Sequence, residues 1–182
     1  MIDRRGLLTL LASAALAPGA GEAAGPHPTI TLWSVLQAAR QDIPAGTEPE
    51  DIDYELTEAV AARLTAGGKA VTLAFATGLV ETTERANRWD LWGAGYVIHG
   101  GMSDDSFAYF RAWLIGQGRG VFDQALADPD SLAETIPQGR EGALDLEGLL
   151  FAPQNAWEEI HAEAERHPGF PEVHVSTDEQ IG

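Results

Sequence analysis

A histidine, two glycines and two aspartates lie close together near the middle of the chain, in residues 99–105, His-Gly-Gly-Met-Ser-Asp-Asp. Carboxylates near an imidazole can serve general acid–base catalysis or hold a hard metal ion through oxygen ligands. Two helices packed as a hairpin around the glycines would bring further polar and aromatic residues within reach. The residues that such a site would offer to a ligand are Trp89, Asp90, His99, Asp104, Asp105 and Arg111.

Each of these polar residues also has a structural explanation. The three carboxylates suit the first turns of helices, where they face the positive end of the helix dipole, and His99 suits a helix C-terminus. Arg111 lies two helical turns beyond Asp104 on the same helix face. The sequence therefore leaves two interpretations open: a polar pocket at the Gly100-Gly101 hinge, or two helices that are merely joined there.

Motifs for other chemistry are missing from the sequence. The sequence contains no His-x-x-x-His pair, which would predict a metal site. It also contains no Gly-x-Ser-x-Gly elbow, which would mark a nucleophilic serine. The glycines in residues 116–120, Gly-Gln-Gly-Arg-Gly, follow a helical pattern instead of a strand, and no Lys-Ser or Lys-Thr comes after them. They do not predict a phosphate-binding loop. We expect neither a metal nor a cofactor, and a non-enzymatic function is favoured over catalysis.

Charge and composition exclude several classes of partner. The formal net charge is −17, from 11 Lys and Arg against 28 Asp and Glu. The electrostatic field of a protein with this net charge repels phosphate backbones and anionic lipid, so we expect no nucleic-acid partner. No run of 18 apolar residues predicts a membrane span. The absence of cysteine excludes a disulfide framework, a thiolate metal site and a cysteine nucleophile.

The first 24 residues have the layout of an export signal. Arg4 and Arg5 precede an uncharged stretch over residues 6–20, and small residues follow. This order is typical of a signal peptide, and Asp-Arg-Arg-Gly-Leu-Leu is similar to a twin-arginine signal. We expect the export machinery to carry the domain across the cytoplasmic membrane to the periplasm or the extracellular space. Residues 1–24 are then removed, and no stable membrane anchor remains.

Apolar residues recur at helical spacing through most of the remaining chain. Helices are predicted over residues 29–40, over residues 52–68 with a glycine pair at the end, and over residues 69–88. A strand competes with a helix for residues 70–76, but the 3.6-residue period continues beyond them. The sequence thus predicts a mostly α fold with six or seven helices. A single compact domain occupies residues 25–182, with a core over about 30–162 and an irregular C-terminal tail.

The middle of the chain predicts a helical hairpin. Residues 89–98 are almost all apolar or small after Asp90, so this helix should be buried on most of its circumference. The glycine pair ends it, and Ser103 can cap a second helix that runs to about Gln117. The tryptophans of the hairpin are expected in the core, because large aromatic side chains dominate packing energy. After residues 118–120, a short helix precedes the turn Pro-Asp-Ser, and a last helix surrounds Trp157.

Residues 88–134 carry a family resemblance. They contain Trp-Asp-Leu-Trp-Gly-Ala, Gly-Gly, Ser-Asp-Asp, Phe-Arg-Ala-Trp-Leu and Ala-Leu-Ala-Asp-Pro-Asp-Ser-Leu in this order. This series resembles the bacterial domain-of-unknown-function family 4240. Leu-Trp-Ser-Val-Leu-Gln-Ala-Ala-Arg and Leu-Leu-Phe-Ala-Pro-Gln-Asn-Ala-Trp-Glu-Glu-Ile are similar to flanking elements of the family, which extends the resemblance to about residues 30–162. The resemblance implies no activity.

Two hypotheses for the function follow. In the first, the chain is a non-enzymatic interaction module, in which an exposed face of a small acidic helical domain binds a protein partner. In the second, it is an enzyme or a small-ligand binder with a polar pocket at the Gly100-Gly101 hinge. The orientation of the carboxylates and of Arg111, toward a cavity or toward solvent, distinguishes the two.

Overall fold

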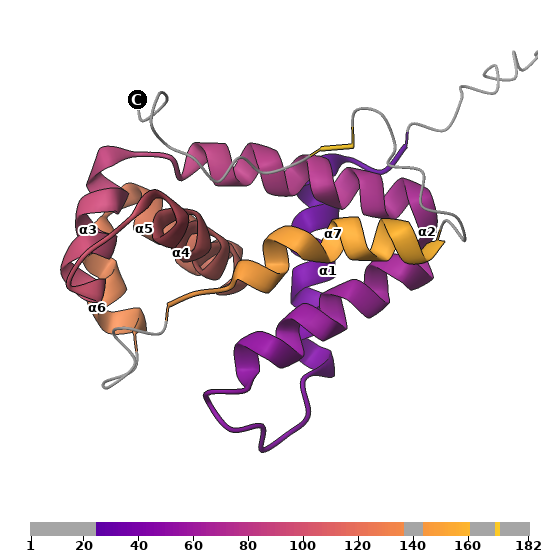
Figure 1. Cartoon of the computed structure of the whole chain (residues 1–182), viewed down its shortest axis with the longest axis horizontal. Coiled ribbons are helices and arrows are strands. Elements are labelled where there is room, and N and C mark those ends of the chain that lie inside the picture. The colour runs from indigo at the N-terminus through magenta and orange to yellow at the C-terminus, as the bar shows by residue number, and fades with distance from the viewer. Residues whose placement is uncertain (1–24, 137–143, 161–169, 172–182) are drawn as a thin grey trace, which may run out of the picture.

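The computed structural model describes residues 25–136, 144–160 and 170–171, which form a compact helical domain (Figure 1). The proposed leader and most of the C-terminal tail lie outside the described residues. Within them the elements are α1 (Pro28–Asp42), α2 (Ile52–Arg85), α3 (Trp89–His99), α4 (Asp104–Gly116), α5 (Arg119–Ala127), the 3-10 helix η1 (Pro129–Ser131), α6 (Leu132–Thr135) and α7 (Glu147–Ile160). The predicted mostly α class, with six or seven helices, is confirmed for the described residues. No described helix combines the length and apolar character needed to cross a membrane.

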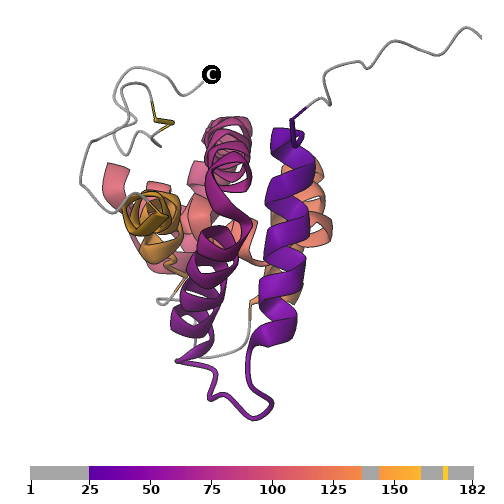
Figure 2. The same ribbon diagram turned by 90° about the vertical axis from the view of Figure 1, so that its right-hand side faces the viewer.

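Helices α1, α2 and α7 form one side of the domain (Figure 2). Leu32 and Leu36 of α1 and Val60 of α2 are fully or almost fully buried, as their helical spacing predicts. The two helices approach most closely at Gly78, where an added Cβ would lie 2.5 Å from the carbonyl oxygen of Pro28. Only glycine therefore allows this approach.

Helix α2 contains the break that the glycine pair predicts. Gly68 has a φ of 72° and a ψ of −177°, a backbone conformation outside the helical region. Glycine adopts positive φ without the steric penalty that a Cβ imposes. The chain resumes a helical course at once, so the prediction of helix over the competing strand for residues 70–76 is confirmed.

The link between α3 and α4 follows the local sequence signals. Gly100 has a left-handed φ of 70°, and the Gly101 amide donates to the carbonyl of Tyr96, which closes the end of α3. Ser103 then caps α4, because its hydroxyl oxygen accepts a hydrogen bond of 3.2 Å from the Ser106 amide. Helix α4 packs against α2, α3, α5 and α7, with Phe107, Phe110 and Leu114 fully buried.

The prediction that α3 is buried on most of its circumference is wrong. Its buried residues are Leu91 and Gly95, whereas Trp89 is 62%, Tyr96 53% and Val97 80% exposed. The main contacts of α3 are with α4 on one face and η1 at its edge, so much of its surface faces solvent. The expectation of a core position holds for Trp113 but not for Trp89.

Candidate functional site

Arg111 lies inside the core. Its side chain is 1% exposed, and its guanidinium lies over the Phe107 ring, 4.8 Å from the ring centroid. Its Nε and Nη1 donate long hydrogen bonds of 3.4 Å to the carbonyls of Phe107 and Thr83. Burial lowers the pKa of the guanidinium, and the charge of Glu84 partly offsets this effect.

The other residues of the predicted ligand set occupy helix ends. Asp104 and Asp105 lie in the first turn of α4, as expected for carboxylates that favour a helix N-terminus. Asp90 lies in the first turn of α3, and its carboxylate accepts a 2.8 Å hydrogen bond from the Leu91 amide. His99 ends α3 with its ring edge toward Phe110, at a centroid distance of 6.0 Å. Each placement agrees with the structural interpretation.

The hydrogen bonds of Arg111 do not connect it to the other predicted residues. Arg111 directs its polar contacts to main-chain carbonyls rather than to the carboxylates of Asp104 and Asp105. Among the described residues, no group of three or more His, Asp and Glu side chains is placed to hold a metal ion. Ligand binding by the full set of six residues stays a prediction, but Trp89 and Asp90 lie at a feature that the sequence did not reveal.

This feature is a groove of about 540 Å³ between α3 and the segment that follows α5. One wall is the face of α3 on which Asp90, Ala94 and Val97 lie. The other wall is the segment from the end of α5 through η1 into α6. The residues that line it are Asp90, Gly93, Ala94, Val97, Ile98, Asp128, Pro129, Asp130, Leu132 and Ala133. Its volume falls in the range of roughly 300–1,000 Å³ that is typical of ligand pockets.

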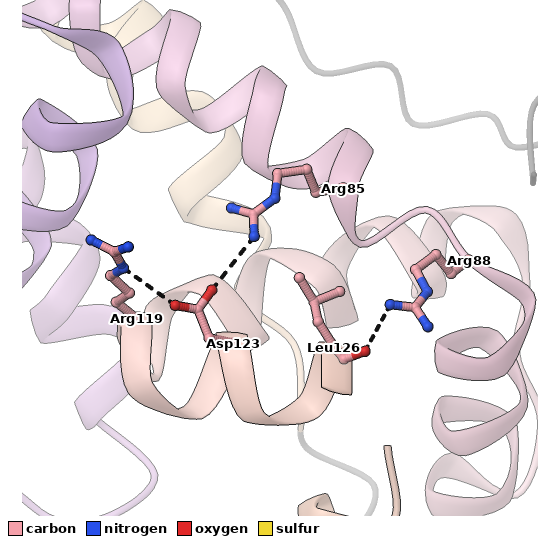
Figure 3. Close-up of polar contacts among 5 residues, drawn as sticks. All are labelled: Arg85, Arg88, Arg119, Asp123 and Leu126. Atoms are coloured by element: carbon pink, nitrogen blue, oxygen red, sulfur yellow. Dashed lines mark hydrogen bonds and ion pairs between the residues drawn. The ribbon is translucent and has the colours of Figure 1, made fainter. Parts of the chain in front are cut away.

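Arg88 holds the two walls of the groove together at one end. Its Nη1 donates a 2.7 Å hydrogen bond to the Leu126 carbonyl at the end of α5 (Figure 3). Its Nη2 donates to the carboxylate of Asp90 in the first turn of α3. One side chain thus fixes the start of α3 against α5 and orients a carboxylate of the groove.

The groove combines an apolar surface with acidic groups. Val97, Ile98 and Leu132 supply aliphatic surface, while Asp90, Asp128 and Asp130 supply carboxylates. The Asp128 carboxylate accepts a 3.2 Å hydrogen bond from the Asp130 amide and so shapes the turn at η1. A cationic or amphipathic ligand would complement this lining, because unlike charges attract and the apolar residues favour burial.

An exposed aromatic surface adjoins the groove. Trp89, at the start of α3, contacts Trp92 with a ring-centroid distance of 6.1 Å, and Trp92 in turn contacts Phe107 of the core at 4.8 Å. Tyr96 is exposed next to Val97 on the same helix. Clusters of exposed aromatic side chains are typical of surfaces that bind other proteins.

Sequence reasoning missed the second wall of the groove. Asp128, Asp130 and Leu132 lie far from Asp90 in the chain, and their local pattern predicts only a turn. The motif Ala-Leu-Ala-Asp-Pro-Asp-Ser-Leu carries part of the family resemblance, but nothing in it indicates that it faces α3. The two segments are brought together by tertiary contacts, among them those between α3 and η1.

Comparison with known proteins identifies the family and nothing more specific. The family described as a protein of unknown function, DUF4240, matches residues 29–159. The chain belongs to this family, as the resemblance in residues 88–134 implied. No curated protein and no solved structure matches the chain.

Proposed function

We propose that this protein is an interaction module that binds a segment of a partner protein in the groove beside α3. The observation that carries the proposal is the exposure of apolar side chains on α3 directly beside an acidic groove. Val97 is 80% exposed although it lines the groove, so its burial by a partner would remove apolar surface from water.

The chemistry of the groove selects the kind of partner segment. Asp90, Asp128 and Asp130 lie on its walls, and Arg88 is bonded to one of these carboxylates, so the lining retains negative charge. The chain as a whole carries a net charge of −17, which repels acidic partners at long range. We therefore expect a segment that presents aliphatic or aromatic side chains next to lysine or arginine.

A peptide library displayed on phage tests this proposal. Selected peptides should combine apolar and basic residues. Val97→Ser removes exposed apolar surface from the groove, and it should weaken their binding by about 1 kcal/mol, roughly fivefold. The matched control is Ile30→Ser, which truncates another exposed β-branched residue, 66% exposed on α1, and should leave binding unchanged.

A charge reversal tests the acidic contribution separately. Asp130→Lys reverses an exposed charge of the groove and should weaken the same peptides at low salt. Glu58→Lys changes the net charge equally on the exposed surface of α2 and serves as the control. Selection of acidic peptides, or equal binding by all four variants, would contradict the proposal. So would a dimer that Val97→Ser dissociates, because the surface would then bind a second copy.

Export is a second part of the proposed function. We propose that Arg4 and Arg5 direct a folded domain through the twin-arginine route, supported by the paired arginines, the mild apolar stretch and the small residues after it. Replacement of both arginines by lysine should abolish translocation, as measured by fractionation. Recovery of the unchanged protein only from the cytosol would reject this part and leave the groove proposal intact.

A further inference from the structure

A second hollow, of about 500 Å³, lies where α1 passes the start of α5. It shares no lining residue with the groove beside α3. The residues that line it are Trp33, Ser34, Gln37, Arg40, Gly118 and Arg119. Two arginines thus meet at one cavity of a strongly acidic protein.

Arg40 is held at the hollow by a contact across the fold. Its Nη1 donates a hydrogen bond to the carbonyl of Gly116, the last residue of α4. A guanidinium carries five N–H donors, so this bond orients the group and leaves further donors for an anion. Gln37, one helical turn before Arg40, is exposed and adds an amide at the same wall.

The other wall also carries an excess of positive charge. Arg119 donates from Nε to the Asp123 carboxylate at 3.2 Å, and Arg85 contacts the other oxygen of the same carboxylate at 3.5 Å (Figure 3). One carboxylate therefore serves two guanidiniums. Together with Arg40 this leaves a local positive balance, against the sign of the whole chain.

The start of α5 contributes main-chain donors to this positive region. Arg119 is the first residue of the helix, and Gly118 before it has a φ of 94° and no side chain that could cap the helix. The first amides of a helix lack acceptors within it. An added Cβ at Gly118 or Gly120 would meet nothing within 4 Å, so space is open beside this main chain.

We propose that this hollow binds a small phosphate-bearing ligand. Arg40 and Arg119 contact the phosphate group from opposite walls, and the first amides of α5 donate to its oxygens. Arginine suits this role, because its planar group of donors matches phosphate oxygens, and helix N-termini favour anions. The glycines of residues 116–120 did not predict such a site by their local pattern, because one of the two cations comes from α1.

Inorganic phosphate is the probe that tests the proposal on the full chain. The titration is followed by amide NMR and calorimetry, with sodium chloride at matched ionic strength as the blank. The amides of Arg119 and Gly120 should shift saturably. Gln37→Glu, which places a carboxylate in the hollow and removes no contact of the fold, should weaken binding by about tenfold or more, and so should Arg40→Gln.

Lys69→Gln is the matched control, since it removes one exposed positive charge that does not line the hollow. It should change the affinity by less than about twofold, because exposed charges are screened. Melting curves show whether Arg40→Gln remains folded, and Gln37→Glu decides the outcome if it does not. The absence of saturable shifts, equal binding by Gln37→Glu and the wild type, or an equal affinity for acetate would overturn the proposal.

Discussion

Helices α3 and α4 are neighbours in the chain, yet the more apolar of the two is the less buried. Helix α3 contains one aspartate and one terminal histidine among apolar and small residues, whereas α4 contains two aspartates and an arginine. Nevertheless nine residues of α4 are buried, including the arginine, and only two of α3. The more apolar helix lies at the surface, and the more charged one lies in the core.

This difference shows what the apolar residues of α3 contribute. Burial in the core requires neighbours on several sides, and α4 has them in α2, α5 and α7, while α3 has mainly α4 and η1. Apolar side chains that the fold does not cover remain available to a partner. The comparison therefore predicts that substitutions in α4 change stability, and that substitutions on the outer face of α3 change binding.

The largest expected effect is in the aromatic core of α4. Phe110 is fully buried between Phe107 and Trp113, at ring-centroid distances of 6.4 and 6.0 Å. Phe110→Ala should lower the free energy of unfolding by about 3–5 kcal/mol, whereas Val97→Ala should change it by less than about 0.5 kcal/mol. Urea unfolding measures both free energies. Similar losses of stability in the two variants would contradict the difference in burial between α4 and α3.

Arg111 gives the next largest effect and separates packing from charge. Arg111→Ala should cost about 2–4 kcal/mol, because the stem of the side chain fills the core. Arg111→Met keeps most of this volume and should be close to neutral, since long hydrogen bonds, the face of Phe107 and the charge of Glu84 offset the cost of burying the guanidinium only in part. If Arg111→Ala and Arg111→Met lowered the melting temperature equally, the charge itself would be shown to stabilise the core.

Two glycines of α3 test its two faces. Gly93 lines the groove, and an added Cβ would meet nothing within 4 Å, so Gly93→Ala should stabilise the protein by up to about 1 kcal/mol through helix propensity. At Gly95 a Cβ would lie 2.5 Å from the end of Met102 and 3.3 Å from the Phe110 ring. Gly95→Ala should therefore be less stable than Gly93→Ala by about 1–2 kcal/mol in the same unfolding assay. Equal stability would show that the side chains of Met102 and Phe110 move aside at little cost.

The smallest effect concerns the start of α4. Ser103→Ala removes the cap on the Ser106 amide and should cost about 1 kcal/mol. Ser103→Asp restores an acceptor and should recover most of this loss, as measured by the shift in melting temperature. Helix α3 has no such side-chain bond at its N-cap residue, Arg88, which instead contacts α5.

Helix limits could be predicted from the sequence because their causes are local. Ser103, Gly100 and Gly68 act on the backbone within a few residues of themselves, and the structure confirms the cap, the end of α3 and the break in α2. The period of the apolar residues likewise predicted helices correctly where a strand was the alternative.

Burial and the groove could not be predicted in the same way. The apolar pattern of α3 predicts a helix but not its packing partners. The number of helices that surround it depends on tertiary contacts, which the local sequence does not determine. The contact of Arg88 with the Leu126 carbonyl joins segments far apart in the chain, and Asp90 and Asp128 from these segments line the same groove. Arg111 lies four residues after Phe107 and three before Leu114, so helical spacing places it on the core face of α4, whereas its charge is typical of an exposed residue.

The glycine link after α3 has a consequence for the dynamics of the domain. Gly100 and Gly101, with φ values of 70° and 153°, connect a helix with two buried residues to one with nine. Regions with few buried contacts open locally at a free energy below that of global unfolding. The amide hydrogens of α3 should exchange with solvent much faster than those of α4, and a partner seated in the groove should slow exchange in α3 first.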